Sequence, residues 1–276
     1  MDEKARAARL TVLEKIAEYE KEGLFDRDVE EDPPTLPLSP GQVDFTGKKL
    51  FTRMGTWLGN RVAHAYFERL IRRGQLIIRS VEGREHLREI SGGAVLTCNH
   101  FHPYDNYAVF KAVEDVLPRK ELYKVIREGN YTNFPGLYGY FFRHCNTLPL
   151  SADLHVLGEL SAAVDVLLRR GEKILVYPEQ GMWWNYKKPR PCKEGAFRFA
   201  AKSMKPVLPL FITMENSDRL DEAGFPLQAY HVHILPPIFP SPALSVRENS
   251  AAMRQKNEQV WKETYEAVYG LPLSYR

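Results

Sequence analysis

The chain is poor in cysteine and has no long hydrophobic run. These two features argue against a disulfide-stabilised protein and against a membrane-spanning one. Its three cysteines, Cys98, Cys145 and Cys192, are odd in number and show no paired spacing, which argues against a disulfide framework or a cysteine-based zinc site. No stretch of about 18 uncharged apolar residues is present, so no transmembrane helix is expected. The amino terminus is charged and lacks the apolar core of a secretory signal. We therefore expect reduced thiols and a cytosolic location.

Length and composition are those of one globular domain with a helical attachment. The chain has 276 residues, 44% of them hydrophobic and 26% charged, and a single core can grow to about 250 residues. Apolar runs predict strands at 75–81, 93–98, 122–126, 173–177, 206–213 and 229–235. Amphipathic stretches predict helices at 2–22, from 105 onward, and at 154–170, 193–203 and 247–269. The predicted fold class is α/β, a mixed central sheet flanked by helices, with an N-terminal helical attachment.

The net charge of +3 is divided unevenly along the chain. Residues 1–32 carry eleven acids against six bases, whereas residues 48–73 carry seven bases against the single acid Glu68. Within that basic segment, apolar residues including Phe51 and Trp57 recur at helical spacing. Such a helix suits the headgroup region of an anionic membrane, although an ordinary helix with a basic outer face has the same pattern. We predict membrane contact, which places the protein at the inner face of the cell membrane.

Proline content and charge together indicate the boundaries of three parts. Residues 1–47 comprise the N-terminal helix and a proline-rich linker at 32–41. Residues 48–74 form the basic amphipathic helix, and residues 75–276 form the catalytic domain.

The strongest chemical signal follows the predicted strand at 93–98. The strand leads into Asn99 and His100, and Asp105 comes five residues after the histidine. An imidazole held by a carboxylate at one nitrogen has a fixed tautomer, so its other nitrogen can remove a proton from a hydroxyl. We therefore predict that His100 is a catalytic base and that Asp105 orients it.

A second polar group follows another predicted strand. The apolar run at 173–177 ends in Pro178 and Glu179. Because ligands bind outside the carboxyl ends of strands in open α/β sheets, Glu179 is expected to lie near His100.

The order and spacing of these blocks resemble the glycerolipid acyltransferases, typified by bacterial 1-acylglycerol-3-phosphate acyltransferase. The resemblance covers about residues 76 to 240. Its blocks are Val81–Gly83, Asn99–Asp105, Arg127 with Phe134–Gly136, Pro178–Glu179 and Pro206–Leu210.

The resemblance implies acyl transfer from a thioester, acyl-CoA or acyl carrier protein, to a hydroxyl of a lysolipid such as 1-acylglycerol-3-phosphate, in phospholipid synthesis. His100 would remove the acceptor proton and Asp105 would stabilise the imidazolium. Asn99, Arg127 and Glu179 are the expected substrate-binding residues. Neither a metal nor another cofactor is implied, and the expected partners are the donor, the acceptor and an anionic membrane surface, without nucleic acid.

The chain departs from the family pattern at two positions where the family has arginine. Met182 stands in the third block, and Ser151 follows the hydrophobic strand of the second block. Guanidinium groups are natural partners of phosphate oxygens. The nearby cations Lys187, Lys188 and Arg190 are therefore candidate substitutes for phosphate binding, or part of a solvated loop.

Several other interpretations stay open. The acceptor could lack a phosphate. Two His-x-His pairs, at His100 and His102 and at His231 and His233, could hold a hydrolytic metal. A thiol mechanism through Cys98 is disfavoured because a thiol inside a strand would be buried and neutral. A noncatalytic lipid-binding protein is the remaining alternative, and the intact pair of His100 and Asp105 argues against it.

Overall fold

A mixed seven-stranded sheet forms the centre of the molecule. The computed structural model describes residues 2–30 and 35–275, so Asp32, Pro33 and Pro34 of the predicted linker lie outside the described residues. The strand order is β1-β7-β6-β2-β5-β3-β4, and every pairing is parallel except that of β6 with β7. The strands are β1 (Ile77–Glu82), β2 (Ala94–Thr97), β3 (Tyr123–Arg127), β4 (Thr147–Leu150), β5 (Lys173–Val176), β6 (Val207–Leu220) and β7 (Pro226–Ile234).

Strand β2 is the structural centre of this sheet. It pairs with β5 on one side, where Thr97 lies opposite Val176, and with β6 on the other, where Leu96 lies opposite Leu208. All four residues of β2 and all four of β5 are buried. Strands covered on both faces are expected to be continuous apolar runs, and the run at 93–98 is of this kind.

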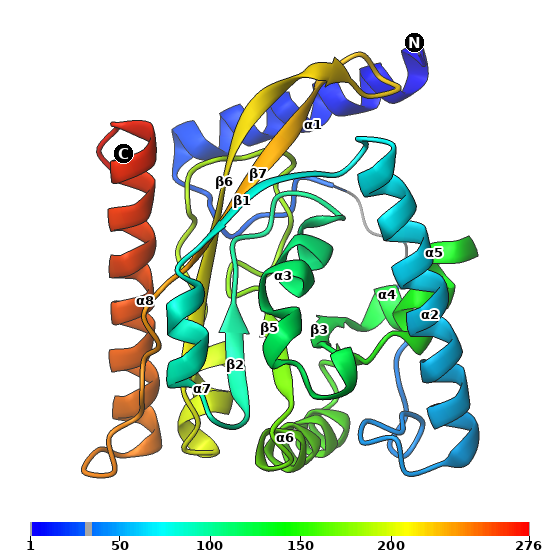
Figure 1. Cartoon of the computed structure of the whole chain (residues 1–276), viewed down its shortest axis with the longest axis vertical. Coiled ribbons are helices and arrows are strands. Elements are labelled where there is room, and N and C mark those ends of the chain that lie inside the picture. Colours follow the sequence, from blue (N-terminus) through cyan, green and yellow to red (C-terminus); the bar gives the residue numbers. More distant parts are fainter. Residues whose placement is uncertain (1, 31–34, 276) are drawn as a thin grey trace.

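Helices cover both faces of the sheet (Figure 1). One core contains Phe67 and Leu70 of α2 together with Tyr107 and Ala108 of α3. The other core contains residues of α6, α7 and α8, among them Trp261. The principal helices are α1 (Glu3–Glu22), α2 (Leu50–Arg72), α3 (Asp105–Val113), α4 (Glu128–Asn133), α5 (Gly136–His144), α6 (Leu154–Arg169), α7 (Gly195–Lys202) and α8 (Val246–Tyr269). Three short 3-10 helices are also present, η1 (Arg84–Glu89), η2 (Glu114–Val116) and η3 (Pro118–Lys120).

The amino-terminal helix α1 lies across the tip of the long β6–β7 hairpin (Figure 1). The backbone N–H of Asp2 donates to the carbonyl of Glu222 at 2.8 Å, and the Arg6 guanidinium donates to the carbonyl of Ala223. Asp2 caps the helix, and Gly23 ends it in the left-handed conformation that glycine adopts without strain. The helix expected at 2–22 is thus present and is tied to the sheet.

The structure differs from the sequence-based expectation in several elements, and β4 was not among the six predicted strand ranges. Strand β6 continues to Leu220, well past residue 213, because its outer part pairs with β7. The sequence did not indicate this extension, since these residues are mostly exposed and polar and show no hydrophobic pattern. The helices α4 and α5 were not expected, since they are short and interrupted by Phe134-Pro135. Helix α5 is held by close packing on α2, where a Cβ at Gly59 would come within 2.6 Å of the His144 carbonyl oxygen.

Within the described residues, no helix combines the length and the apolar character that crossing a bilayer requires. The long helix α2 is amphipathic instead, with Phe67 and Leu70 buried in the core and most of its first half exposed.

Candidate active site

His100 lies in the loop after β2, and Asp105 is the first residue of α3. The Nδ1 atom of His100 is 2.8 Å from Oδ2 of Asp105. The same oxygen accepts hydrogen bonds from the backbone N–H groups of Phe101 and His102, at 3.0 and 3.2 Å. The Asp105 side chain is fully buried, whereas 21% of the His100 side chain is exposed. Two backbone donors therefore hold the carboxylate, and the carboxylate in turn directs Nδ1–H of the imidazole, which leaves Nε2 as a proton acceptor.

Tyr177 completes this arrangement from the neighbouring strand. Its hydroxyl donates to Oδ1 of Asp105 at 2.5 Å, and its ring stacks on the imidazole of His100 with 4.0 Å between ring centroids. Burial, with the Asp105 charge close by, raises the pKa of the Tyr177 phenol well above its usual value, so the hydroxyl stays protonated and donates. The sequence contained a signal for this residue, since it ends the strand predicted at 173–177. In the structure Val176 lies opposite Thr97, so Tyr177 and the His100 loop leave the sheet at the same edge.

Glu179 braces the backbone of the histidine loop. One carboxylate oxygen accepts from the backbone N–H of His100 at 3.0 Å, and the other accepts from the backbone N–H of Arg190 at 2.8 Å. The side chains of Glu179 and Arg190 are both buried and form an ion pair at 3.3 Å. The loop around Trp183 also contacts the histidine loop, because the backbone N–H of Trp183 donates to the carbonyl of His100 at 3.2 Å. Glu179 thus lies near His100, as expected, but its bonds are to the protein.

Asn99 clamps the end of β2 against β6. Its side-chain amide donates to the carbonyl of Ile212 at 3.0 Å and accepts from the N–H of the same residue at 2.8 Å. The side chain is buried, with 3% of its surface exposed. These two hydrogen bonds give Asn99 a structural role, which is to join the end of β2 to β6.

The cations expected to bind phosphate have other partners. Arg190 donates to the carbonyls of Phe25 and Gly181 and lies under the Trp183 ring. Lys188 binds the Glu20 carboxylate and the carbonyl of Ser274. The ammonium group of Lys187 lies 5.5 Å from the ring centroid of Tyr269. None of these three described side chains lines the cavity that His100 faces, so their positions give no support to phosphate binding.

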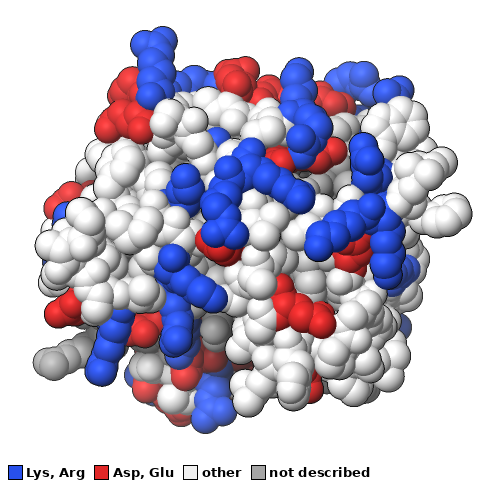
Figure 2. All heavy atoms as spheres, turned by 90° about the horizontal axis from the view of Figure 1, so that it is seen from below, with Lys and Arg blue, Asp and Glu red and all other residues white. Residues whose placement is uncertain are grey.

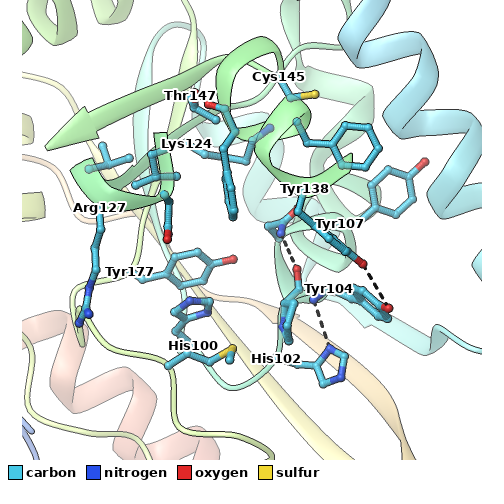
Figure 3. Close-up of a pocket in the computed structure, with 18 of the residues that line it drawn as sticks. His100, His102, Tyr104, Tyr107, Lys124, Arg127, Tyr138, Cys145, Thr147 and Tyr177 are labelled. Carbon is cyan, nitrogen blue, oxygen red and sulfur yellow. Dashed lines mark hydrogen bonds between the residues drawn. The ribbon is translucent and has the colours of Figure 1, made fainter. Parts of the chain in front are cut away.

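Arg127 does line that cavity, at the carboxyl end of β3. Its guanidinium forms an ion pair with Asp28, at 2.5 Å, and both side chains are partly exposed. Of the expected substrate-binding residues it is the one that lines the cavity, on the same side as Tyr177 and His100 in Figure 3.

The cavity in front of His100 is large, about 1870 Å³. Figure 3 shows His100, Tyr177 and Arg127 on one side of it and Tyr104, Tyr107 and Tyr138 on the other. Further apolar and aromatic lining comes from the helices α2 and α5, namely Ala63, Tyr66, Phe67, Leu70, Phe141 and Phe142. A polar reactive group facing a long aromatic wall suits a substrate with a polar head and an apolar chain.

The metal and thiol alternatives find little geometry to support them. Burial lowers the pKa of His102 to about 4, and its Nδ1 accepts from the N–H of Tyr104 at 3.2 Å. His231 contacts Ser80 and Glu215 instead. Within residues 2–30 and 35–275, no three His, Cys, Asp or Glu side chains gather as a metal site. Cys98 is fully buried, which raises the pKa of its thiol well above the usual value.

Comparisons with known proteins place the histidine loop inside a recognised sequence family. Residues 78–213 match the family model described as Acyltransferase. The fold is similar to that of the 1-acyl-sn-glycerophosphate (LPA) acyltransferase PlsC from Thermotoga maritima, with a TM-score of 0.52 and 19% sequence identity over 80% of each chain. No curated protein matches the sequence. The matched residues include β2, the His100 loop, Tyr177 and Glu179.

Proposed function

The chain is a member of the acyltransferase family, and from that premise we propose that it moves a fatty acyl group from a thioester donor to a hydroxyl of a lysophospholipid. The observation that carries the proposal is the set His100, Asp105 and Tyr177 at the wall of an aromatic cavity. A base with a fixed tautomer beside an apolar cavity is what acyl transfer to a lipid hydroxyl requires.

In the proposed reaction His100 is the general base. Its Nε2 removes the proton of the acceptor hydroxyl as the oxygen attacks the thioester carbonyl, so that a C–O bond forms. When the tetrahedral intermediate collapses, the C–S bond breaks and the imidazolium returns its proton to the leaving thiolate. Asp105 stabilises the imidazolium during these steps, and Tyr177 positions Asp105.

The size and lining of the cavity support a lipid acceptor and a long acyl chain. Pockets for small molecules commonly measure about 300–1,000 Å³, and this cavity exceeds that range. Acyl-CoA or acyl carrier protein is the proposed donor, and 1-acylglycerol-3-phosphate, in phospholipid synthesis, is the first acceptor to test. We assign the chemistry to residues 75–276, with residues 1–47 as an amino-terminal attachment.

Helix α2, within residues 48–74, is the proposed contact with an anionic membrane. Its first half exposes large apolar side chains at helical spacing, Leu50, Phe51, Met54, Trp57 and Leu58. The amino-terminal end of α2 lies at the lower end of the molecule in Figure 1, and Figure 2 shows many Lys and Arg side chains on the face seen from below. Apolar side chains beside cations are typical of helices that lie in a membrane interface. Such a contact would hold the protein at the inner face of the cell membrane.

The test of the activity is a thioester-consumption assay with a panel of lysolipid and alcohol acceptors. Release of free thiol that depends on the acceptor, and that survives chelation, is the expected result. Release without an acylated product, or release abolished by chelation, would favour hydrolysis over transfer. The membrane contact is tested separately by sedimentation with anionic vesicles. Replacing Arg53 and Arg61 by Glu should weaken sedimentation at low salt.

A further inference from the structure

Three acidic residues in the segment 26–30, which follows α1, form ion pairs with three cationic residues that line the cavity. The acids alternate along the segment, and each forms an ion pair with a residue that lines the cavity. The pairs are Asp26 with Lys193 at 3.6 Å, Asp28 with Arg127 at 2.5 Å, and Glu30 with Arg9 at 2.7 Å. A stretch of only five residues therefore neutralises charges contributed by three separate parts of the chain.

Apolar side chains of the same segment anchor it beside the active site. Phe25 stacks on Trp183, with 5.9 Å between ring centroids, and Val29 is buried in the same small core. The indole N–H of Trp183 donates to the carbonyl of Arg27 at 2.9 Å. Since the backbone N–H of Trp183 also donates to His100, the acids lie on a support that contacts the catalytic loop.

Gly181 leaves the space in which Asp28 meets Arg127. A Cβ at this position would lie 2.5 Å from Oδ1 of Asp28 and 3.3 Å from Nη2 of Arg127. Any larger residue would push the Asp28 side chain aside. Three segments distant in sequence are thus fitted to one another at this ion pair.

This arrangement changes which head group the cavity can take. Asp28 and Glu30 line the cavity together with Arg127 and Arg9, with which they form ion pairs, so two carboxylates stand beside these two cations. A phosphate monoester carries about −1.5 to −2 at neutral pH and would lie against the carboxylates. A zwitterionic head group has a singly charged phosphodiester, which a guanidinium can bind, and an ammonium group, which a carboxylate can bind. Both side chains are reachable, since Arg127 is 39% and Asp28 is 49% exposed.

The other cations that line the cavity belong to different elements. Arg69 and Arg73 lie in and just after α2, Lys120 and Lys124 lie before and within β3, and Arg198 and Lys202 lie in α7. None of these six cations takes part in the ion pair of Asp28 and Arg127 next to Gly181.

We propose that Asp28 and Arg127 together determine head-group specificity, and that the acceptor is a lysophospholipid with a zwitterionic phosphate-and-ammonium head group. The inference rests on the proposed acyl transfer and names its acceptor class. Arg127 binds the phosphodiester, and Asp28 binds the ammonium group and disfavours a phosphate monoester.

The kinetic test compares three short-chain monomeric acceptors: lysophosphatidylethanolamine, lysophosphatidate and monoacylglycerol. The wild-type protein should have its highest kcat/KM with lysophosphatidylethanolamine. Asp28→Asn should lower the preference for it over lysophosphatidate by about twofold to fivefold, the upper part of the range that exposed ion pairs contribute. Asp115→Asn is the matched control, because Asp115 pairs with Arg84 at 3.2 Å outside the cavity. It should leave the preference unchanged.

A second variant keeps every charge and crowds the ion pair, above all its carboxylate. Gly181→Ala should displace Asp28 and reduce the same preference. In an Arg127→Ala background, Asp28→Asn should have a smaller effect, because the two residues act together. A wild-type preference for lysophosphatidate, or an acceptor ratio that neither variant changes by twofold, would overturn the assignment.

Binding measured without turnover separates this inference from the acyl transfer on which it rests. His100→Ala protein, titrated with the same three lipids by tryptophan fluorescence, should bind lysophosphatidylethanolamine most tightly and should lose that preference with Asp28→Asn. If the wild-type protein has this binding preference but transfers no acyl group, the proposed reaction is overturned. Transfer activity with equal binding of all three lipids would overturn the head-group assignment alone.

Discussion

Two loops follow neighbouring buried strands, and they use their polar residues in opposite ways. The loop after β2 presents His100 to the cavity and holds it from behind with Asp105. The loop after β5 turns Glu179 and Arg190 inward, where both are buried and paired. The first loop carries the proposed chemistry, and the second is its support. Charge in a loop beside an active site is therefore no sign of ligand binding until its partners are known.

The largest expected effect tests the first loop. His100→Ala removes the proposed general base, and general base catalysis typically contributes about 10²–10⁴-fold. We expect kcat to fall by about 10³-fold while the thermal midpoint stays close to that of the wild type. Purified variant with turnover within tenfold of wild type would show that another group is the base.

The second loop is tested by stability rather than by rate. Glu179→Ala leaves Arg190 buried without its carboxylate, a change that typically costs about 3–5 kcal/mol. Urea unfolding should show the loss in every buffer, with or without substrate. The matched variant Glu194→Ala, at an exposed position before α7, should change the midpoint little. A Glu179→Ala protein of normal stability that cannot transfer acyl groups would mean that Glu179 acts on substrate.

His102, in the first loop, should make the stability of the folded protein depend on pH. Its pKa is lowered from 6.5 to about 4, mainly by burial, so between these values the unfolded chain binds a proton that the folded chain does not. Stability should therefore fall as the pH drops from 6.5 towards 4, by up to about 3 kcal/mol from this residue. His102→Asn keeps an acceptor for the N–H of Tyr104, and its unfolding free energy should depend less on pH in this range. Identical pH profiles for the two proteins would contradict this.

Tyr177 connects the two loops, and its removal should have a smaller effect. Tyr177→Phe keeps the ring on His100 and removes only the hydrogen bond to Asp105. We expect kcat to fall by about tenfold with little change in KM, because hydrogen bonds to charged groups contribute about 1.5–3 kcal/mol. The pH dependence of kcat should also shift. A change confined to KM would place Tyr177 among the acceptor-binding residues instead.

The smallest effect is expected for Lys187 and Lys188 of the second loop. Lys188 binds Glu20 and the carbonyl of Ser274, so Lys187 and Lys188 replaced together by Ala should leave KM for lysophosphatidate within about twofold. The midpoint of unfolding should fall slightly because α1 loses a contact. A marked rise in KM for lysophosphatidate, with normal KM for monoacylglycerol, would restore these lysines as phosphate ligands.

The sequence predicted well where a residue's role depends on its near neighbours. The buried run at 93–98 became β2, and the five-residue spacing of His100 and Asp105 became a 2.8 Å contact. Helices with a clear apolar face or a cap, such as α6 and α8, were found within a few residues of their ends. Helix α5 was missed because it packs on α2, which lies far away in the sequence, and α4 was missed because it is only six residues long.

What the sequence determined by itself is the fold class of the molecule and the spacing that brings His100 and Asp105 together, because apolar periodicity and short spacings are local properties. Only the tertiary structure decided what the charged side chains do. Arg190 is buried against Glu179, and Asp28 lies on Arg127 across 99 residues of sequence. An ion pair depends on the positions of both partners in space, and those positions follow from how the sheet and the amino-terminal segment pack.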